Sequence, residues 1–226
     1  SRQLAQGLLS APDINADFFY GATWSRVVRP LPLPGAGVLL PWVRSHIPFS
    51  YALRRQIQRA RFGGHVTNQR FDLYHEPNFL PLPFDGPTVI TVHDLSWIRH
   101  PEAHPIERVA AMNRYFQAGL EQANLLLTDS FFVKMELMDA FRVSEDKIRV
   151  IPLGVEPLFH PLPSDGTRDT LAPWKLEHGR YFLTVGTMEP RKNLQTALDA
   201  YARLPSSIRK QFPLVLSGMK GWNISK

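Results

Sequence analysis

Residues 181–204 read YFLTVGTMEPRKNLQTALDAYARL, a stretch that changes from one periodicity to another at a glycine. The apolar and β-branched run at 181–186 predicts a strand. The apolar positions that follow recur at steps of three and four, as on one face of a helix: Leu194, Ala197, Leu198, Tyr201 and Leu204. Strand, turn and helix in this order are the repeating unit of parallel α/β sheets.

The same alternation extends back to residue 71. Further strands are predicted at 71–75, 88–93, 124–129, 147–153 and 213–218. Apolar residues at helical spacing mark two helices between them: Met112, Phe116, Leu120 and Ala123 in one, Val133, Leu137 and Phe141 in the other. The fold class predicted is therefore α/β, with parallel sheets covered by helices.

Residues 156–175 carry four prolines and no sustained periodicity, which predicts a crossover between two units. We expect a first domain at 1–160, a linker at 161–175 and the start of a second domain at 176–226. The second domain contains only strand, helix and strand, too little to cover a doubly wound sheet. We therefore expect the protein to continue beyond Lys226. No element is predicted within 21–62.

Composition excludes several classes of protein. Of the 226 residues 44% are hydrophobic and 20% charged, as in ordinary globular proteins. The absence of cysteine excludes a disulfide framework, thiol catalysis and thiolate metal sites, and favours a reducing compartment. No apolar run reaches the roughly 18 residues of a spanning helix. These features predict a cytoplasmic protein.

The formal charge of +6 points to anionic partners: nucleic acid, a membrane surface or phosphorylated small molecules. Much of the excess lies in YALRRQIQRARFGG at 51–64, where a solvated helix face is the simplest interpretation. Aromatic residues do not interleave with these arginines and no nucleic-acid motif follows. A non-catalytic basic module for nucleic acid therefore stays only a remote alternative.

The loop Gly186–Asn193 has the features of an anion site. Ligands of open parallel sheets bind outside the carboxyl ends of the strands, where helices begin. Asn193 is predicted to cap the following helix, and Arg191 and Lys192 add positive charge beside its first N–H groups. The bland alternative is a solvated cation pair beside a turn. A diphosphate is the ligand that the full pattern favours.

VGTMEPRKNL followed by PLVLSGMKGW closely resembles the opening of the donor-binding domain in GT-B-fold glycosyltransferases of the large retaining family four. The bacterial members that build lipopolysaccharide, capsule and other surface glycans are especially similar. TVITVHDL, ANLLLTDSFFVKMEL and VSEDKIRVIPLGVEPLF look like late strands and helices of the family's acceptor-side domain, and SRQLAQGLL like the helix after its N-terminal glycine-rich loop. The resemblance implies two Rossmann-like domains, the second incomplete in this chain.

By the same resemblance, the donor is bound at the second domain. Many family members carry an arginine directly after the glycine of the first donor-domain strand, where this chain has Thr187; that role passes here to Arg191. The expected donor-binding residues are Gly186, Thr187, Arg191, Lys192, Asn193, Gly218 and Lys220. For Gly218 and Lys220 a plain turn and a contact to the nucleotide are equally good interpretations. The family's distal glutamates lie past Lys226.

The first domain is expected to supply the remaining site residues. His93 ends a predicted strand, and the family's strand-end histidine contacts the donor sugar and the leaving phosphate; Asp94 is structural or faces the acceptor. His75 and Asn78 are expected to line the acceptor side. His75 and Glu76 cannot easily share a metal ion, because adjacent strand residues point to opposite faces. No metal and no cofactor is expected.

The resemblance predicts a hexosyltransferase that moves a sugar from a nucleotide diphosphate donor to a glycan or lipid-linked acceptor with retention of configuration. His93, Arg191 and Lys192 are the expected catalytic residues. Mannose from GDP-mannose is the first choice of donor, and an anionic membrane surface is an expected partner for residues 27–61. A sugar-nucleotide epimerase or a glycogen synthase or phosphorylase is the alternative within the fold. A Rossmann dehydrogenase is disfavoured, because no G-x-G-x-x-G follows a strand.

Overall fold

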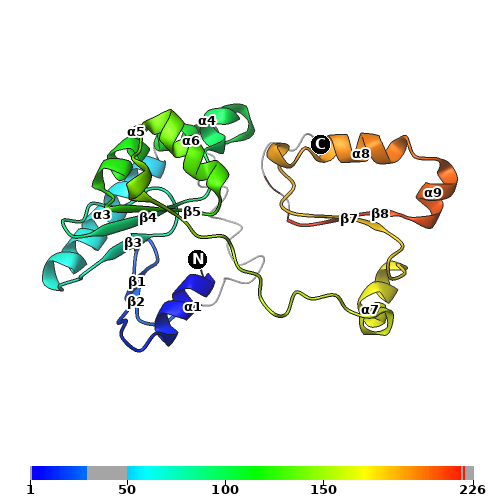
Figure 1. Ribbon diagram of the computed structural model, residues 1–226, viewed down its shortest axis with the longest axis horizontal. Coiled ribbons are helices and arrows are strands. Elements are labelled where there is room, and N and C mark those ends of the chain that lie inside the picture. The colour runs from blue at the N-terminus through cyan, green and yellow to red at the C-terminus, as the bar shows by residue number, and fades with distance from the viewer. Residues whose placement is uncertain (1, 30–49, 220, 222–226) are drawn as a thin grey trace. The chain divides into compact units, whose positions relative to one another are not determined.

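The computed structural model describes residues 2–29, 50–219 and 221 (Figure 1). The chain divides into two compact units, Ser1–Leu95 with Glu107–Pro152 and Ser96–Ile106 with Leu153–Lys226. The predicted boundaries at 160 and 175 stay a prediction. The strands are β1 (Phe18–Phe19), β2 (Trp24–Ser25), β3 (Tyr74–Glu76), β4 (Thr88–Val92), β5 (Leu125–Thr128), β6 (Ile148–Val150), β7 (Phe182–Val185) and β8 (Leu214–Ser217). The helices are α1 (Arg2–Ser10), α3 (Ser50–Asn68), α4 (Ser96–Arg99), α5 (Ile106–Gln122), α6 (Phe131–Phe141), α7 (Ser164–Leu171), α8 (Leu194–Ala202) and α9 (Ser206–Gln211).

The first unit is built on a parallel sheet in the order β3-β4-β5-β6 (Figure 1). β4 is a central strand, and Ile90 and Val92 are fully buried within it. Near-continuous burial of a strand is typical of a parallel sheet with helices on both faces. Residues Met112, Phe116 and Leu120 of α5 are buried as their spacing predicts. The predicted α/β class is confirmed.

The second unit contains one parallel pair, β7 and β8, with α8 and α9 between them in the chain (Figure 1). All six strands predicted from residue 71 onward are present, and each contains fewer residues than predicted. The strand predicted at 71–75 begins only at Tyr74, since Phe71 and Asp72 belong to the preceding turn. Residues 156–175 were expected to lack regular structure, yet α7 forms there, with Pro163 preceding its first turn. Within 21–62 the structure adds β2 and α3, and residues 30–49 lie outside the described part.

The loops that follow β7 and β8 touch backbone to backbone. Gly186 N–H donates to Ser217 O at 2.9 Å, and Met188 N–H donates to Met219 O at 2.9 Å. A Cβ added to Gly218 would lie 1.8 Å from the carbonyl oxygen of Gly186. Only glycine therefore fits at position 218, which gives this residue a structural role whatever else it contacts.

Gly218→Ala should destabilise the second unit, because the blocking atom is backbone oxygen and cannot rotate away. We expect a loss of roughly 3 kcal/mol in the free energy of unfolding, at the upper end of the range for overpacking. The matched control is Gly166→Ala in α7, where a Cβ would meet Pro163 Cδ at an ordinary 3.6 Å. In thermal melts of the full-length protein, the melting temperature of Gly218→Ala should be lower than that of wild type. The melting temperature of Gly166→Ala should be equal to or above that of wild type. Equal melting of Gly218→Ala and wild type would contradict the contact.

Candidate functional site

His93 lies at the carboxyl edge of the first unit's sheet, directly after β4. The parallel register pairs Val92 with Thr128, so the residues that follow, His93 and Asp129, are neighbours. His93 Nδ1 lies 2.7 Å from Asp129 Oδ2, and Nε2 lies 2.9 Å from the carbonyl oxygen of Pro77. Three successive strand ends therefore meet at one imidazole.

The two partners define what the His93 ring can do. A carbonyl oxygen only accepts, so Nε2 donates to Pro77. Nδ1 accepts from a protonated Asp129, or donates to the carboxylate when the ring carries a second proton. The side chain is still 38% exposed, and Phe79 packs edge-on against it with ring centroids 5.6 Å apart. The ring is accessible, and a ligand seeking Nε2 must replace Pro77.

The Pro77 carbonyl is itself held in place by a network that begins at Glu76. The Tyr74 hydroxyl donates to Glu76 Oε2 at 2.8 Å, and Asn78 N–H donates to Glu76 Oε1 at 3.0 Å. Leu82 N–H donates to the Tyr74 hydroxyl at 3.2 Å. Both ends of the 77–82 loop are thus fixed to β3, and Pro77 is presented to His93.

Arg55 of α3 completes this network. Its guanidinium donates to the Pro81 carbonyl at 2.7 Å and stacks over the ring of Tyr115 at 4.4 Å. The solvated helix face predicted for residues 51–64 is wrong for Arg55, because its side chain reaches the 77–82 loop. Burial raises the pKa of Glu76, and the Tyr74 and Asn78 donors oppose that shift. Burial and the Glu76 charge likewise raise the pKa of Tyr74.

The three expected acceptor residues have different environments. His75 Nε2 lies 2.9 Å from Thr91 Oγ1, and burial lowers the pKa of the His75 ring. Asn78 is exposed at the sheet's edge, and its backbone is bonded to Glu76. Asp94 follows His93 and is half-buried. Asn78 is thus accessible from solvent, whereas the His75 ring contacts the neighbouring strand, and the acceptor role of all three residues stays a prediction.

The second unit carries the two cations of the 186–193 loop. Arg191 is bonded to Glu189, with 2.8 Å between guanidinium nitrogen and Oε1, and the Glu189 side chain is only 3% exposed. Lys192 reaches back over the turn, since a Cβ added to Gly186 would lie 3.8 Å from Lys192 Cε. Within the described part of the chain Lys192 forms no ion pair. The two adjacent cations are therefore not equivalent.

The predicted cap of α8 is wrong in its geometry. Asn193 does precede the helix, but its backbone is left-handed, with φ 50° and ψ 43°, and its side chain bonds no backbone N–H. Its Oδ1 instead accepts from Thr196 Oγ1 at 2.9 Å. The reason is that Pro190–Lys192 form a short 3₁₀ turn, and the left-handed Asn193 links this turn to α8. Thr187 is half-buried in the same loop, and Lys220 lies outside the described residues.

His93 belongs to the first unit and the Arg191–Lys192 pair to the second, so their meeting at one reaction centre stays a prediction. Asp129 was not among the site residues predicted from the sequence, although it directly follows a strand at the edge where His93 was expected. In the described ranges no three His, Cys, Asp or Glu side chains gather as a metal site would need. No helix there has the length and apolarity to cross a membrane.

Comparisons with known proteins agree on one family. The model of Glycosyltransferase Family 4 matches residues 10–157. The chain is 38% identical over 187 residues to O-antigen chain mannosyltransferase B of Escherichia coli, covering 82% of this chain and 49% of that protein. It is 25% identical over 136 residues to the serotype-specific mannosyltransferase WbdA of Escherichia coli, covering 58% of this chain and 16% of that protein. The chain thus spans about half the length of the first relative and a smaller part of the second.

Among solved structures, sucrose-phosphate synthase from Thermosynechococcus elongatus is similar, with a TM-score of 0.57 and 19% sequence identity. The match covers 79% of this chain and 45% of that chain. At this identity the likeness concerns the fold, and it confirms the predicted architecture of Rossmann-like domains with parallel sheets.

The raised pKa of Glu76 predicts a pH-dependent stability. The folded protein holds this proton more tightly than the unfolded chain, so stability falls as pH rises from the ordinary carboxyl value toward the folded one. The stability of wild type relative to Glu76→Gln should therefore decrease as the pH rises above the ordinary carboxyl pKa of about 4.3. Urea unfolding of both proteins across this range measures the difference.

Glu145→Gln is the matched control with the opposite sign. Lys134 lowers the pKa of Glu145, so wild type should gain stability over this variant as pH rises through the acid range. If the stability of wild type relative to Glu76→Gln stayed constant or rose with pH, burial would not disfavour the ionised Glu76 carboxylate.

Proposed function

Because the chain belongs to glycosyltransferase family 4, we propose that the whole protein transfers a sugar from a nucleotide diphosphate donor to a hydroxyl of a glycan or lipid-linked acceptor, with retention of configuration. The observation that carries the proposal is the 186–193 loop. In this loop the Lys192 side chain lies over Gly186, the glycine that follows β7, and α8 begins two residues after Lys192. Within the described part of the chain this lysine forms no ion pair. Such a loop suits a diphosphate.

The names of the relatives support mannose as the transferred sugar. Two curated relatives are mannosyltransferases, and one acts on an O-antigen chain according to its name. We propose GDP-mannose as the donor and a growing surface glycan as the acceptor. Thermal-shift measurements with GDP, UDP, dTDP and ADP discriminate between donor nucleotides, because a bound nucleotide stabilises the folded state by mass action.

The proposed chemistry depends on charge at the leaving group. When the sugar departs, negative charge builds on the β-phosphate, and a preorganised cation there contributes about 2.7–4 kcal/mol to lowering the barrier. Lys192 suits this role because no carboxylate in the described residues neutralises it. A phosphate oxygen then accepts the proton of the acceptor hydroxyl on the same face. The reaction needs no metal in this proposal.

Arg191 has a different part, because its guanidinium already neutralises the buried Glu189. Moving it to a phosphate would leave a carboxylate unpaired in a nearly inaccessible position, which is costly. We assign Arg191 to holding the loop in shape and His93 to contacting the donor sugar. Lys192 is therefore the cleaner residue for a kinetic test.

Lys192→Ala should lower kcat by roughly 100- to 1000-fold while changing the affinity for the donor much less, since its interaction strengthens as charge develops. The melting temperature should stay near wild type, because the side chain is exposed. Lys192→Arg tests geometry, as it keeps the charge but replaces a compact ammonium by a broad fork. Lys210→Ala, an exposed lysine at the end of α9, is the control. Wild-type turnover in Lys192→Ala would refute the role.

We also propose that the protein works at the inner face of the cytoplasmic membrane without spanning it. Arg54 and Arg59 are exposed on α3, while residues 30–49 of the proposed contact region lie outside the described part. Cations near an anionic surface contribute about 1 kcal/mol each.

Flotation with anionic vesicles should therefore recover wild type at low salt and lose it at high salt. Arg54→Gln/Arg59→Gln should weaken the association about 30-fold, at roughly 1 kcal/mol per cation. Equal recovery with neutral vesicles, or no recovery at low salt, would contradict this proposal.

A further inference from the structure

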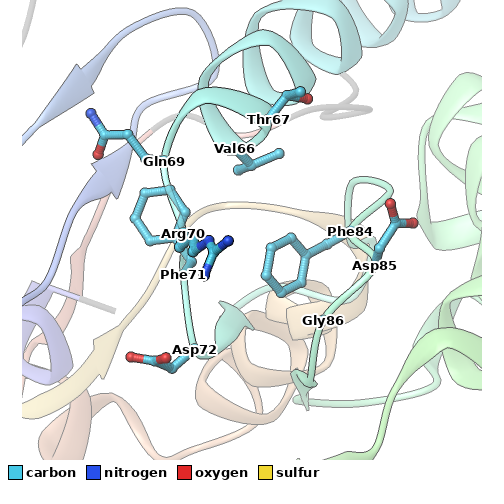
Figure 2. A pocket seen from close by; sticks show the side chains of 9 residues that line it. All are labelled: Val66, Thr67, Gln69, Arg70, Phe71, Asp72, Phe84, Asp85 and Gly86. Carbon is cyan, nitrogen blue, oxygen red and sulfur yellow. The ribbon is translucent and has the colours of Figure 1, made fainter.

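A concave surface lies at the edge of the first unit's sheet that is opposite to His93. It is a cavity of about 440 Å³, and its walls come from the end of α3, the turn before β3 and the turn before β4 (Figure 2). β3 and β4 are parallel, so the turns before them lie together at the amino edge. The five residues of β4 separate the two edges by about 16 Å. The cavity is therefore distinct from the proposed reaction centre.

Two phenylalanines supply the apolar part of the lining. Phe71 stacks on Trp24 with ring centroids 5.7 Å apart, and Phe84 packs edge-on against Tyr74 at 5.8 Å. Each ring is held by another aromatic ring and is half-buried. In the view of Figure 2 the Arg70 side chain lies between the two rings. They form two fixed apolar platforms in a polar opening.

The polar part of the lining is acidic on balance. Asp72 and Asp85 are exposed, and in the described part of the chain neither forms an ion pair. Arg70 is the cation among the lining residues, and the carboxyl end of α3 adds partial negative charge. The lining of the cavity thus has a negative net charge, although the whole chain has a net charge of +6. Phosphates and nucleic acid are unsuited to it.

A metal ion is also a poor match, because the described residues hold no cluster of three ligating side chains. The lining instead suits a neutral molecule that has both C–H faces and many hydroxyl donors. C–H groups pack on aromatic rings, and ionised carboxylates accept hydroxyl protons at two oxygens each. The volume lies within the range of pockets for small ligands.

We propose that this cavity binds a neutral segment of a glycan chain, at a distance from the site of sugar transfer. The proposal rests on the proposed function, since a growing glycan is the hydroxyl-rich polymer that the enzyme would meet. Sugar rings lie against Phe71 and Phe84, and their hydroxyls donate to Asp72 and Asp85. A chain held here and at the reaction centre gains effective concentration at both, so long acceptors are retained better than short ones.

The test uses the full-length protein and mannohexaose as the probe. Isothermal titration should give a Kd for mannohexaose that rises about tenfold in Asp72→Asn/Asp85→Asn, because two charged acceptors are lost. Both side chains are exposed, so thermal melts should show an intact fold. Asp139→Asn, an exposed acid on α6, is the matched control and should bind as wild type does. Hydrogen exchange should slow at residues 66–72 and 84–86 when mannohexaose is added.

Separate measurements distinguish a failure of this proposal from a failure of the proposed function. Transfer of mannose from GDP-mannose is assayed on the same wild-type preparation. If wild type transfers mannose but binds mannohexaose no better than the double variant, the cavity is not a glycan site. If exchange slows at 66–72 and 84–86 and the double variant loses binding, the cavity is a glycan site even where no mannose is transferred. Slowing confined to residues 75–78 and 93–94 would overturn the proposal.

Discussion

The parallel hydrogen bonding of β3, β4, β5 and β6 is the constraint on which the first unit's site depends. The register pairs Glu76 with Ile90 and Val92 with Thr128, which brings Pro77, His93 and Asp129 to one edge. A slip of one residue would turn every side chain of a strand to the other face. Ile90 and Val92 lie on the same face of β4 and are fully buried there, so a slip of one residue would remove both from the core that they fill. The apolar core thus sets the position of a polar triad.

In the second unit backbone contact performs the corresponding role. The loop after β7 is bonded to the loop after β8 through Gly186, Met188 and Gly221, and Gly218 lets the chains approach that closely. A loop fixed on one side by another loop loses little order when a ligand binds. This matters for a site that stabilises developing charge, since such stabilisation depends on groups that are already in position.

The sequence predicted the parts of the fold that local periodicity determines. The buried face of α5 and the core of each strand from β3 to β8 are where alternation and helical spacing place them. It could not predict contacts between distant side chains, such as Arg55 with Pro81 or His93 with Asp129, because these follow from tertiary packing. The left-handed Asn193 has a local cause, but the 3₁₀ turn before it lacks a recognised sequence pattern. The cavity at the amino edge could not be predicted for the same reason, because tertiary packing brings its three lining segments together.

Arg191 and Lys192 are adjacent in the sequence but differ in what they contact. A guanidinium offers several N–H donors in a plane, so Arg191 can bond the buried Glu189 and keep an exposed edge. An ammonium is a compact charge on a flexible stem, and the stem of Lys192 lies over Gly186, where an added Cβ would be 3.8 Å from Lys192 Cε. The pair of Arg191 and Glu189 has no net charge, so the net attraction of this loop for an anion comes from Lys192. A diphosphate drawn to the loop would therefore settle beside the lysine rather than between the two cations.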